Sequence, residues 1–134
     1  NDVDEDDLTN MSAAIAIANP RHAPYGRAAE EVLHKTGNTK LKRIKGSNVA
    51  QAFSFVQTGN AIAGLVALSQ LRYNRNAEHT YWIIPADYHR TIEQQAVVIR
   101  GADHRAEDFL EFMETTEARK IIKKAGYDLA DRHD

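Results

Sequence analysis

A short apolar run that leads directly into a loop and a helix constrains the fold of this chain most strongly. Residues 13–18 are small and mostly apolar, which is typical of a strand buried on both faces of a parallel sheet. After a loop with two prolines, apolar residues at helical spacing predict a helix from about Gly26 to Thr36, ended by Gly37. A buried strand followed at once by a helix favours an α/β fold.

The same pattern recurs further along the chain. Residues 41–45 alternate as in a short strand, and Asn48 with Gln51 three positions later predicts the capping box of a helix that Gly59 ends. Residues 61–68 are a second buried run. This order predicts parallel strands joined by right-handed crossovers, in a mixed, mostly parallel sheet flanked by helices. In such sheets, ligands bind beyond the carboxyl ends of the strands.

The other segments carry weaker patterns. Residues 1–10 hold five acids and predict either a frayed leader or a short helical turn at residues 4–8. A polar loop is expected at residues 71–79, and strands are expected at 80–84 and 92–99. Two helices are expected to finish the chain. The first has an apolar face formed by Ala106, Phe109, Leu110 and Met113. The second begins near Thr116 and has an apolar face formed by Ala118, Ile121, Ile122 and Ala125.

The composition excludes several classes of function. The 17 Lys and Arg residues are scattered and outnumbered by 19 Asp and Glu, so the net charge of −2 does not favour nucleic-acid binding. The absence of cysteine excludes disulfides, thiolate metal ligands and cysteine nucleophiles. No apolar run approaches the roughly 20 residues that cross a bilayer. The six histidines lack the helical spacing of a metal site, so no metal or other cofactor is expected.

The start of the first predicted helix lacks the usual cap. The residues Ala23-Pro24-Tyr25-Gly26 offer no Asn, Asp, Ser or Thr side chain to the N–H groups of the first turn. Such a helix start attracts anions, although water often satisfies the same donors. Two predicted helices begin just after buried strands at one edge of the sheet, so their first N–H groups could converge on one anion.

Five sequence blocks over about residues 13–130 carry a resemblance to a known family. The first block reads I-A-N-P-x-x-A-P-Y-G-R-A-A at residues 17–29. The later blocks, in the order of the family, lie at residues 46–52, 58–69, 88–98 and 109–127. Together they resemble the second lobe of periplasmic molybdate-binding proteins of bacterial ABC importers.

This resemblance implies the organisation of the chain. Residues 1–91 would form the second lobe of a two-lobed, type II periplasmic binding protein. Residues 92–134 would form a crossover strand and two helices that return to the first lobe. The first lobe itself has no counterpart here, so the chain is interpreted as a fragment, whose unpartnered apolar surfaces could lead to self-association.

The resemblance also implies a function and a site. The protein would capture molybdate or tungstate in the periplasm and deliver it to the membrane subunits of an ABC importer, without enzymatic activity and without entering the membrane. The backbone N–H groups of Tyr25 and Val49 would bind the oxyanion. Some family members add a tyrosine hydroxyl, but here that position is Ala67; Ser69 could substitute for it, although a local capping role is favoured.

Other functions stay open from the sequence. A binding protein for another tetrahedral oxyanion such as sulfate would differ only in cavity size. The effector-binding domain of a transcription regulator would share the two-lobed architecture. A hydrolase is disfavoured, because Ser69, His89 and Asp87 lack the glycine pattern of a nucleophile elbow. Arg27 beside the site could steer anions, but a solvated surface role is favoured, and Trp82 is expected in the core.

Overall fold

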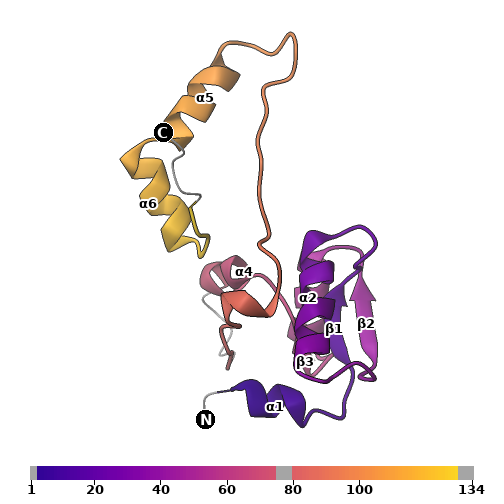
Figure 1. Cartoon of the computed structure of the whole chain (residues 1–134). Coiled ribbons are helices and arrows are strands. Elements are labelled where there is room, and N and C mark those ends of the chain that lie inside the picture. The colour runs from indigo at the N-terminus through magenta and orange to yellow at the C-terminus, as the bar shows by residue number, and fades with distance from the viewer. Residues whose placement is uncertain (1–2, 75–79, 130–134) are drawn as a thin grey trace. The chain divides into compact units, whose positions relative to one another are not determined.

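Three parallel strands form the only sheet found in the described part of the chain. The computed structural model describes residues 3–74 and 80–129, and its strands are β1 (Ile15–Ala18), β2 (Arg43–Gly46) and β3 (Ala63–Gly64). The strand order is β2-β1-β3, with β1 parallel to both neighbours (Figure 1). All four residues of β1 are buried. The α/β class and the parallel core predicted from the sequence are therefore confirmed.

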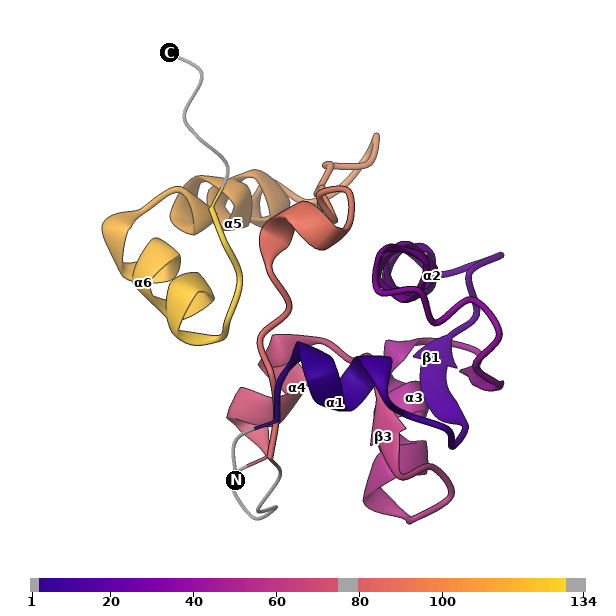
Figure 2. The same cartoon turned by 60° about the horizontal axis from the view of Figure 1, so that its bottom comes forward.

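Two helices cover opposite faces of this sheet. Helices α2 (Pro24–Lys35) and α3 (Val49–Gln57) flank the sheet (Figure 2). Helix α2 packs Val32 and Leu33 with Ile15 and Ile17, whereas α3 packs Ala52 beside Ala16. Alternate side chains of a strand point to opposite faces, so the two helices lie on different sides. The connection from β1 to β2 and the connection from β2 to β3 run in opposite directions across the sheet. Because both crossovers have the same handedness, their helices α2 and α3 lie on opposite faces.

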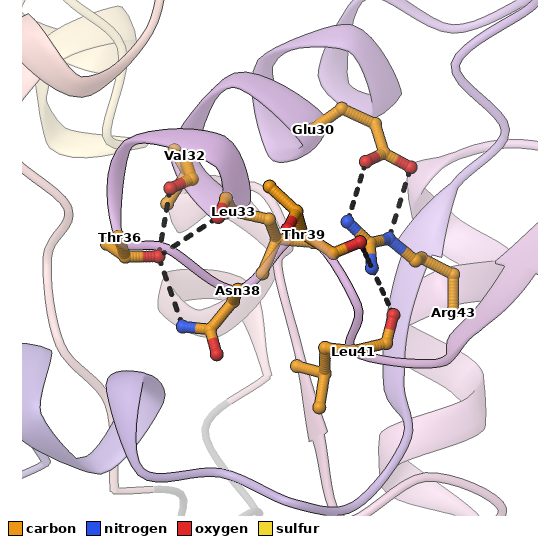
Figure 3. A network of polar contacts seen from close by, with 8 residues as sticks. All are labelled: Glu30, Val32, Leu33, Thr36, Asn38, Thr39, Leu41 and Arg43. Atoms are coloured by element: carbon orange, nitrogen blue, oxygen red, sulfur yellow. Dashed lines mark hydrogen bonds and ion pairs between the residues drawn. The ribbon is translucent and has the colours of Figure 1, made fainter.

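A polar network closes the turn between α2 and β2 (Figure 3). The Thr36 hydroxyl donates to the Val32 carbonyl, and the Asn38 side chain donates to the Thr36 hydroxyl. The Asn38 side chain also donates to the Leu8 carbonyl. The Arg43 guanidinium bonds both carboxylate oxygens of Glu30 and the carbonyls of Thr39 and Leu41. Thr36 and Asn38 are buried, so these bonds satisfy polar groups that would otherwise destabilise the fold.

The acidic leader forms a helical turn, which is one of the two alternatives that the sequence left open. Helix α1 (Glu5–Thr9) begins after Asp4, whose side chain accepts from the N–H groups of Asp6 and Asp7. The Asp7 side chain accepts from the Asp4 N–H in return, which completes a capping box. Leu8 is buried in the same core cluster as Ile15 and Ile17. The leader is therefore anchored to the sheet by one apolar side chain and by the Asn38 contact.

Four predictions of secondary structure need correction. Residues 80–84 and 92–99 are extended but are not strands, because neither segment forms a ladder with any part of the chain that the structure describes. A strand needs a partner for its N–H and C=O groups, and local sequence cannot supply one. The strand expected at 61–68 is limited to β3. The first residues of the loop expected at 71–79 belong to helix α4 (Leu68–Tyr73), and residues 75–79 lie outside the described part of the chain.

The chain divides into two compact units, Asn1–Ile92 and Glu93–Asp134. The first contains the sheet and the short 3-10 helix η1 (Ala86–Tyr88). The second contains α5 (Arg105–Met113) and α6 (Thr116–Lys124), as the sequence predicts, with Ala118 buried and Thr115 capping α6. The crossover strand expected at the start of residues 92–134 does not form in the described residues. The assignment of residues 92–134 to another lobe stays a prediction.

Candidate functional site

The carboxyl ends of β1 and β2 lie side by side and form the base of the candidate site. The last residues of these strands, Ala18 and Gly46, are partners in the parallel register. The ladder continues one step further, since the Asn19 N–H donates to the Gly46 carbonyl at 2.7 Å. Because α2 follows β1 and α3 follows β2, both helices begin at this edge, although their bodies lie on opposite faces of the sheet.

The start of α2 is pressed onto the end of β1. Gly26 is buried, and a Cβ built on it would lie 2.4 Å from the Ala18 carbonyl oxygen. Only a residue without a side chain lets the helix approach so closely. Ala23 occupies the N-cap and offers no side-chain bond, as the sequence predicts. Tyr25, the second residue of α2, is half-buried.

The loop before α2 is folded on itself by Asn19. The Asn19 side-chain oxygen accepts from the Arg21 N–H at 3.0 Å. The backbone carbonyl of Asn19 accepts from the N–H groups of His22 and Ala23. The Ala23 carbonyl in turn accepts from Gly26 and Arg27. The N–H groups that flank Tyr25 in the sequence therefore have internal partners, and Pro24 has no N–H.

The start of α3 has the same close packing. A Cβ built on Gly46 would lie 2.8 Å from the Ala52 nitrogen, so the first turn of α3 sits directly on the end of β2. The Asn48 side chain accepts from the Gln51 N–H at 2.9 Å, as the predicted capping box requires. The Gln51 side chain, however, accepts from the Ser47 N–H at 2.6 Å rather than from Asn48. Val49 is the first residue of α3 and is half-buried.

The starts of α2 and α3 carry no acidic side chain. Neither α2 nor α3 carries an acidic residue in its first turn, whereas α1, α5 and α6 all do. An acid in the first turn would compete with a bound anion for the positive end of the helix dipole. Arg27 is exposed, in line with the surface role favoured by the sequence.

The third strand brings Ala67 towards the same edge. β3 pairs with β1, and the ladder continues through the Leu65 N–H to the Ala16 carbonyl. Ala67 is buried and precedes α4, and its N–H donates to the Gln70 side chain at 3.0 Å. Ser69 is the second residue of α4, so it does not occupy the N-cap expected of a local capping residue, and Gln70 provides the bond instead.

The described residues contain none of the features of two other site classes. In residues 3–74 and 80–129, no group of three or more His, Asp or Glu side chains is placed to hold a metal ion. Within the same ranges, no helix has the length and apolar character required to cross a membrane.

Sequence reasoning missed the bond from the Ala67 N–H to the Gln70 side chain and the close approach at Gly46. The signal for Gln70 was present, since it stands three positions after Ala67, at the spacing of a capping box. Ala67 has no capping side chain of its own, so the sequence pattern is incomplete. The close approach at Gly46 has no local signal, because it depends on where α3 returns to the sheet.

Comparison with known proteins defines the class. The profile of the bacterial extracellular solute-binding protein family matches residues 1–128. The chain is 42% identical over 118 residues to the molybdate-binding protein ModA of Rhodobacter capsulatus, covering 84% of this chain and 46% of the relative. It is 40% identical over 126 residues to ModA of Azotobacter vinelandii, covering 90% of this chain and 50% of the relative.

A solved structure agrees with the sequence relatives. The periplasmic molybdate-binding protein of Azotobacter vinelandii superposes with a TM-score of 0.79 at 35% sequence identity, covering 91% of this chain and 56% of that one. The fold is thus that of a solute-binding protein. The chain belongs to the bacterial extracellular solute-binding protein family, and it spans about half the length of the curated relatives it matches.

Proposed function

We propose that this chain forms the second lobe and returning segment of a periplasmic protein that captures molybdate or tungstate and delivers it to an ABC importer. One observation carries the proposal: two acid-free helix starts lie at adjoining strand ends, in a chain about two-fifths identical to proteins named for molybdate binding. The name of the solved relative supports a periplasmic location, and the name of an ABC transporter substrate-binding relative in Bacillus subtilis supports an importer as partner.

The proposed ligands are backbone N–H groups at the starts of α2 and α3. Tyr25 and Val49 would each donate one hydrogen bond to an oxygen of the anion. A hydrogen bond to a charged oxygen contributes about 1.5–3 kcal/mol net. The two amide nitrogens are expected to lie about 4–7 Å apart, since each N–H···O distance is near 2.9 Å.

Neutral donors suit a protein that must release its cargo. A lysine or arginine in the site would attract any anion, whereas fixed N–H groups recognise the size and tetrahedral arrangement of the oxygens. In the whole protein, the second lobe would close on the anion against a first lobe by a hinge motion. The closed form is the one that we expect the importer to recognise, and no chemical step is required.

A calorimetric titration of the 134-residue chain with molybdate, tungstate and sulfate tests this proposal. We expect saturable binding of molybdate and tungstate and weaker binding of sulfate. The affinity for molybdate should be at least about a hundredfold below that of the Rhodobacter relative measured in parallel, because two or three charged hydrogen bonds from another lobe are missing. Equal binding of sulfate would favour another oxyanion carrier, and no heat with any oxyanion would contradict the site.

Sub-micromolar affinity of this chain for molybdate would contradict a different part of the account. It would mean that residues 1–134 hold all the ligands the anion needs. The proposal that the site is shared with a first lobe would then be wrong, while the assignment of Tyr25 and Val49 would remain.

A further inference from the structure

Residues 80–90, here called the strap, lie against α1 and α2 without joining the sheet. Trp82 and Ile84 pack on the core cluster that contains Ile15 and Leu33, whereas Tyr81 and Ile83 are exposed. This alternation was predicted for a strand, yet the strap pairs with no strand in the described residues. Side-chain contacts therefore hold it in place of a ladder.

The main polar contact of the strap is made by Lys35, at the end of α2. Its ammonium group donates to the Asp87 carboxylate and to the Asp87 carbonyl, both at 2.8 Å. The same nitrogen lies 4.3 Å from the centroid of the Tyr88 ring, within the range of a cation–π contact. One ammonium group thus binds three partners from the short helix η1.

Three further contacts fix the ends of this arrangement. The Tyr88 hydroxyl donates to a Glu5 carboxylate oxygen of α1 at 2.6 Å, and its ring meets Trp82 edge-on with centroids 5.9 Å apart. Beyond η1, the Arg90 N–H donates to the Glu31 carboxylate of α2 at 2.7 Å. The anchored part of the chain therefore ends two residues before the boundary between the two compact units at Ile92.

We propose that Lys35 and Tyr88 form a latch that holds the strap on α2 and so fixes where the connection between the two units begins. Residues 91–99, which follow the strap, are extended and mostly exposed, with Val97 and Ile99 among them. With the latch closed, the pivot between the units lies in residues 91–99. With the latch open, it extends back through the strap. This inference does not depend on the proposed ligand.

The latch acts as a group of contacts rather than as one ion pair. A single exposed ion pair contributes little to stability, because water and salt screen it. Here the Asp87 pair, the carbonyl bond and the ring contact share one ammonium group, so removing its charge breaks all three together. Replacing Lys35 by Met keeps the length of the side chain over the ring and removes only the charge and the donors.

Native-state proteolysis with thermolysin tests the latch on the full 134-residue chain. Thermolysin cleaves before bulky apolar residues, so cleavage at Ile83 or Ile84 reports on the strap, and cleavage at Val97 to Ile99 reports on the following segment. In the wild-type chain we expect cleavage mainly at residues 97–99. In Lys35→Met we expect cleavage at 83–84 to rise about tenfold, with an unchanged rate at 97–99.

Two further variants make the result specific. Lys42→Met removes an exposed charge in the same unit and should leave both cleavage rates as in wild type. Tyr88→Phe keeps the ring and loses the bond to Glu5, so its effect on strap cleavage should be smaller than that of Lys35→Met. An unchanged rate of cleavage at residues 83–84 in Lys35→Met would overturn the proposal. So would an equal rise at both sites, because that result means the whole unit opens rather than the strap alone.

Discussion

Gly26 lies so close to Ala18 that a Cβ on the glycine would be 2.4 Å from the alanine carbonyl oxygen. This relationship joins the first turn of the helix that follows β1 to the last residue of that strand. A similar approach joins Gly46 at the end of β2 to the Ala52 nitrogen of α3, at 2.8 Å. The absence of two side chains therefore sets how deeply both helix starts sit at the sheet edge.

Replacing Gly26 by Ala should destabilise the fold and weaken oxyanion binding. Alanine gains about 0.5–1 kcal/mol of helix propensity. The clash is with backbone, which cannot rotate away, and such overpacking costs about 1–3 kcal/mol. We expect the clash to exceed the propensity gain in urea unfolding. The neighbouring Arg27→Ala, at an exposed position, should change stability by less than about 0.5 kcal/mol. An equally stable Gly26→Ala would contradict the close approach.

Replacing Arg43 by Lys should also destabilise the fold. Arg43 is 14% exposed in its side chain and bonds both Glu30 oxygens together with two loop carbonyls. An ammonium group cannot reproduce this forked geometry. We expect a loss of about 1–3 kcal/mol in the free energy of unfolding. Lys42→Arg, at the adjacent exposed position, serves as the control. An unchanged free energy of unfolding in Arg43→Lys would show that the network in Figure 3 contributes shape but little stability.

Asp87 should make stability fall in acid. The hydrogen bond from Lys35 holds the pKa of the Asp87 carboxyl below its usual value of 3.8, and the charge of Lys35 acts in the same direction. Because the folded pKa is lowered, the contribution is present above 3.8 and is lost as the pH falls through the folded value. Urea midpoints measured between about pH 2 and pH 6 should therefore change less steeply in Asp87→Asn than in wild type. Lys35→Met should flatten the same region, and parallel slopes in all three proteins would contradict the assignment.

The elements that the sequence predicted well are those whose signals are local. Gly37, Gly59 and Gly126 follow helix ends and have positive φ angles of 78°, 74° and 99°, as glycines in that position often do. Asn48 caps α3 by its own side chain. Each of these features depends on residues within four positions of one another, so the sequence contains the whole interaction.

The elements that it predicted poorly depend on distant partners. Residues 80–84 have the alternation of a strand, and Trp82 does face the core, but their backbone meets no neighbouring strand in the described chain. The contacts that hold this segment join Lys35 to Asp87, 52 positions apart, and Glu5 to Tyr88, 83 positions apart. The two proposed site residues came from a family resemblance. The pairing of the strand ends that precede their helices, Ala18 with Gly46, rests on a register that no local pattern specifies.

Exposed apolar side chains predict that this chain self-associates. Val97 is 81% exposed, Ile99 72%, Phe109 58% and Ile121 54%, all in the second unit. Burying such surface contributes about 25 cal/mol per Å², and exposed apolar patches on this scale usually mark interfaces. Size-exclusion chromatography with light scattering should give a mass above one chain that decreases on dilution. Phe109→Glu should shift the chain towards monomer, and a wild-type monomer at all concentrations would refute this prediction.

Backbone and side-chain roles at the two site residues can be separated by substitution. Tyr25→Phe removes a hydroxyl and keeps the N–H, so molybdate affinity should stay within about threefold. Val49→Pro removes the N–H at the first position of α3, where proline is tolerated, and Asn48 already has the extended backbone that precedes a proline (φ −149°, ψ 176°). This variant should fold and lose binding. Val49→Ala, which keeps the N–H, is the matched control, and a large loss in Tyr25→Phe would mean that the hydroxyl takes part.

The most direct test of the proposed site is to follow individual amides by NMR while molybdate is added to the ¹⁵N-labelled chain. The amides of Tyr25 and Val49 should shift together along one saturation curve, more than those of α5 and α6, and equal concentrations of chloride should leave them in place. Because chemical shifts report weak binding, this measurement works even if the affinity is low. Shifts that are absent at these two amides, or that saturate at different concentrations for each, would contradict a single oxyanion site at the carboxyl ends of β1 and β2.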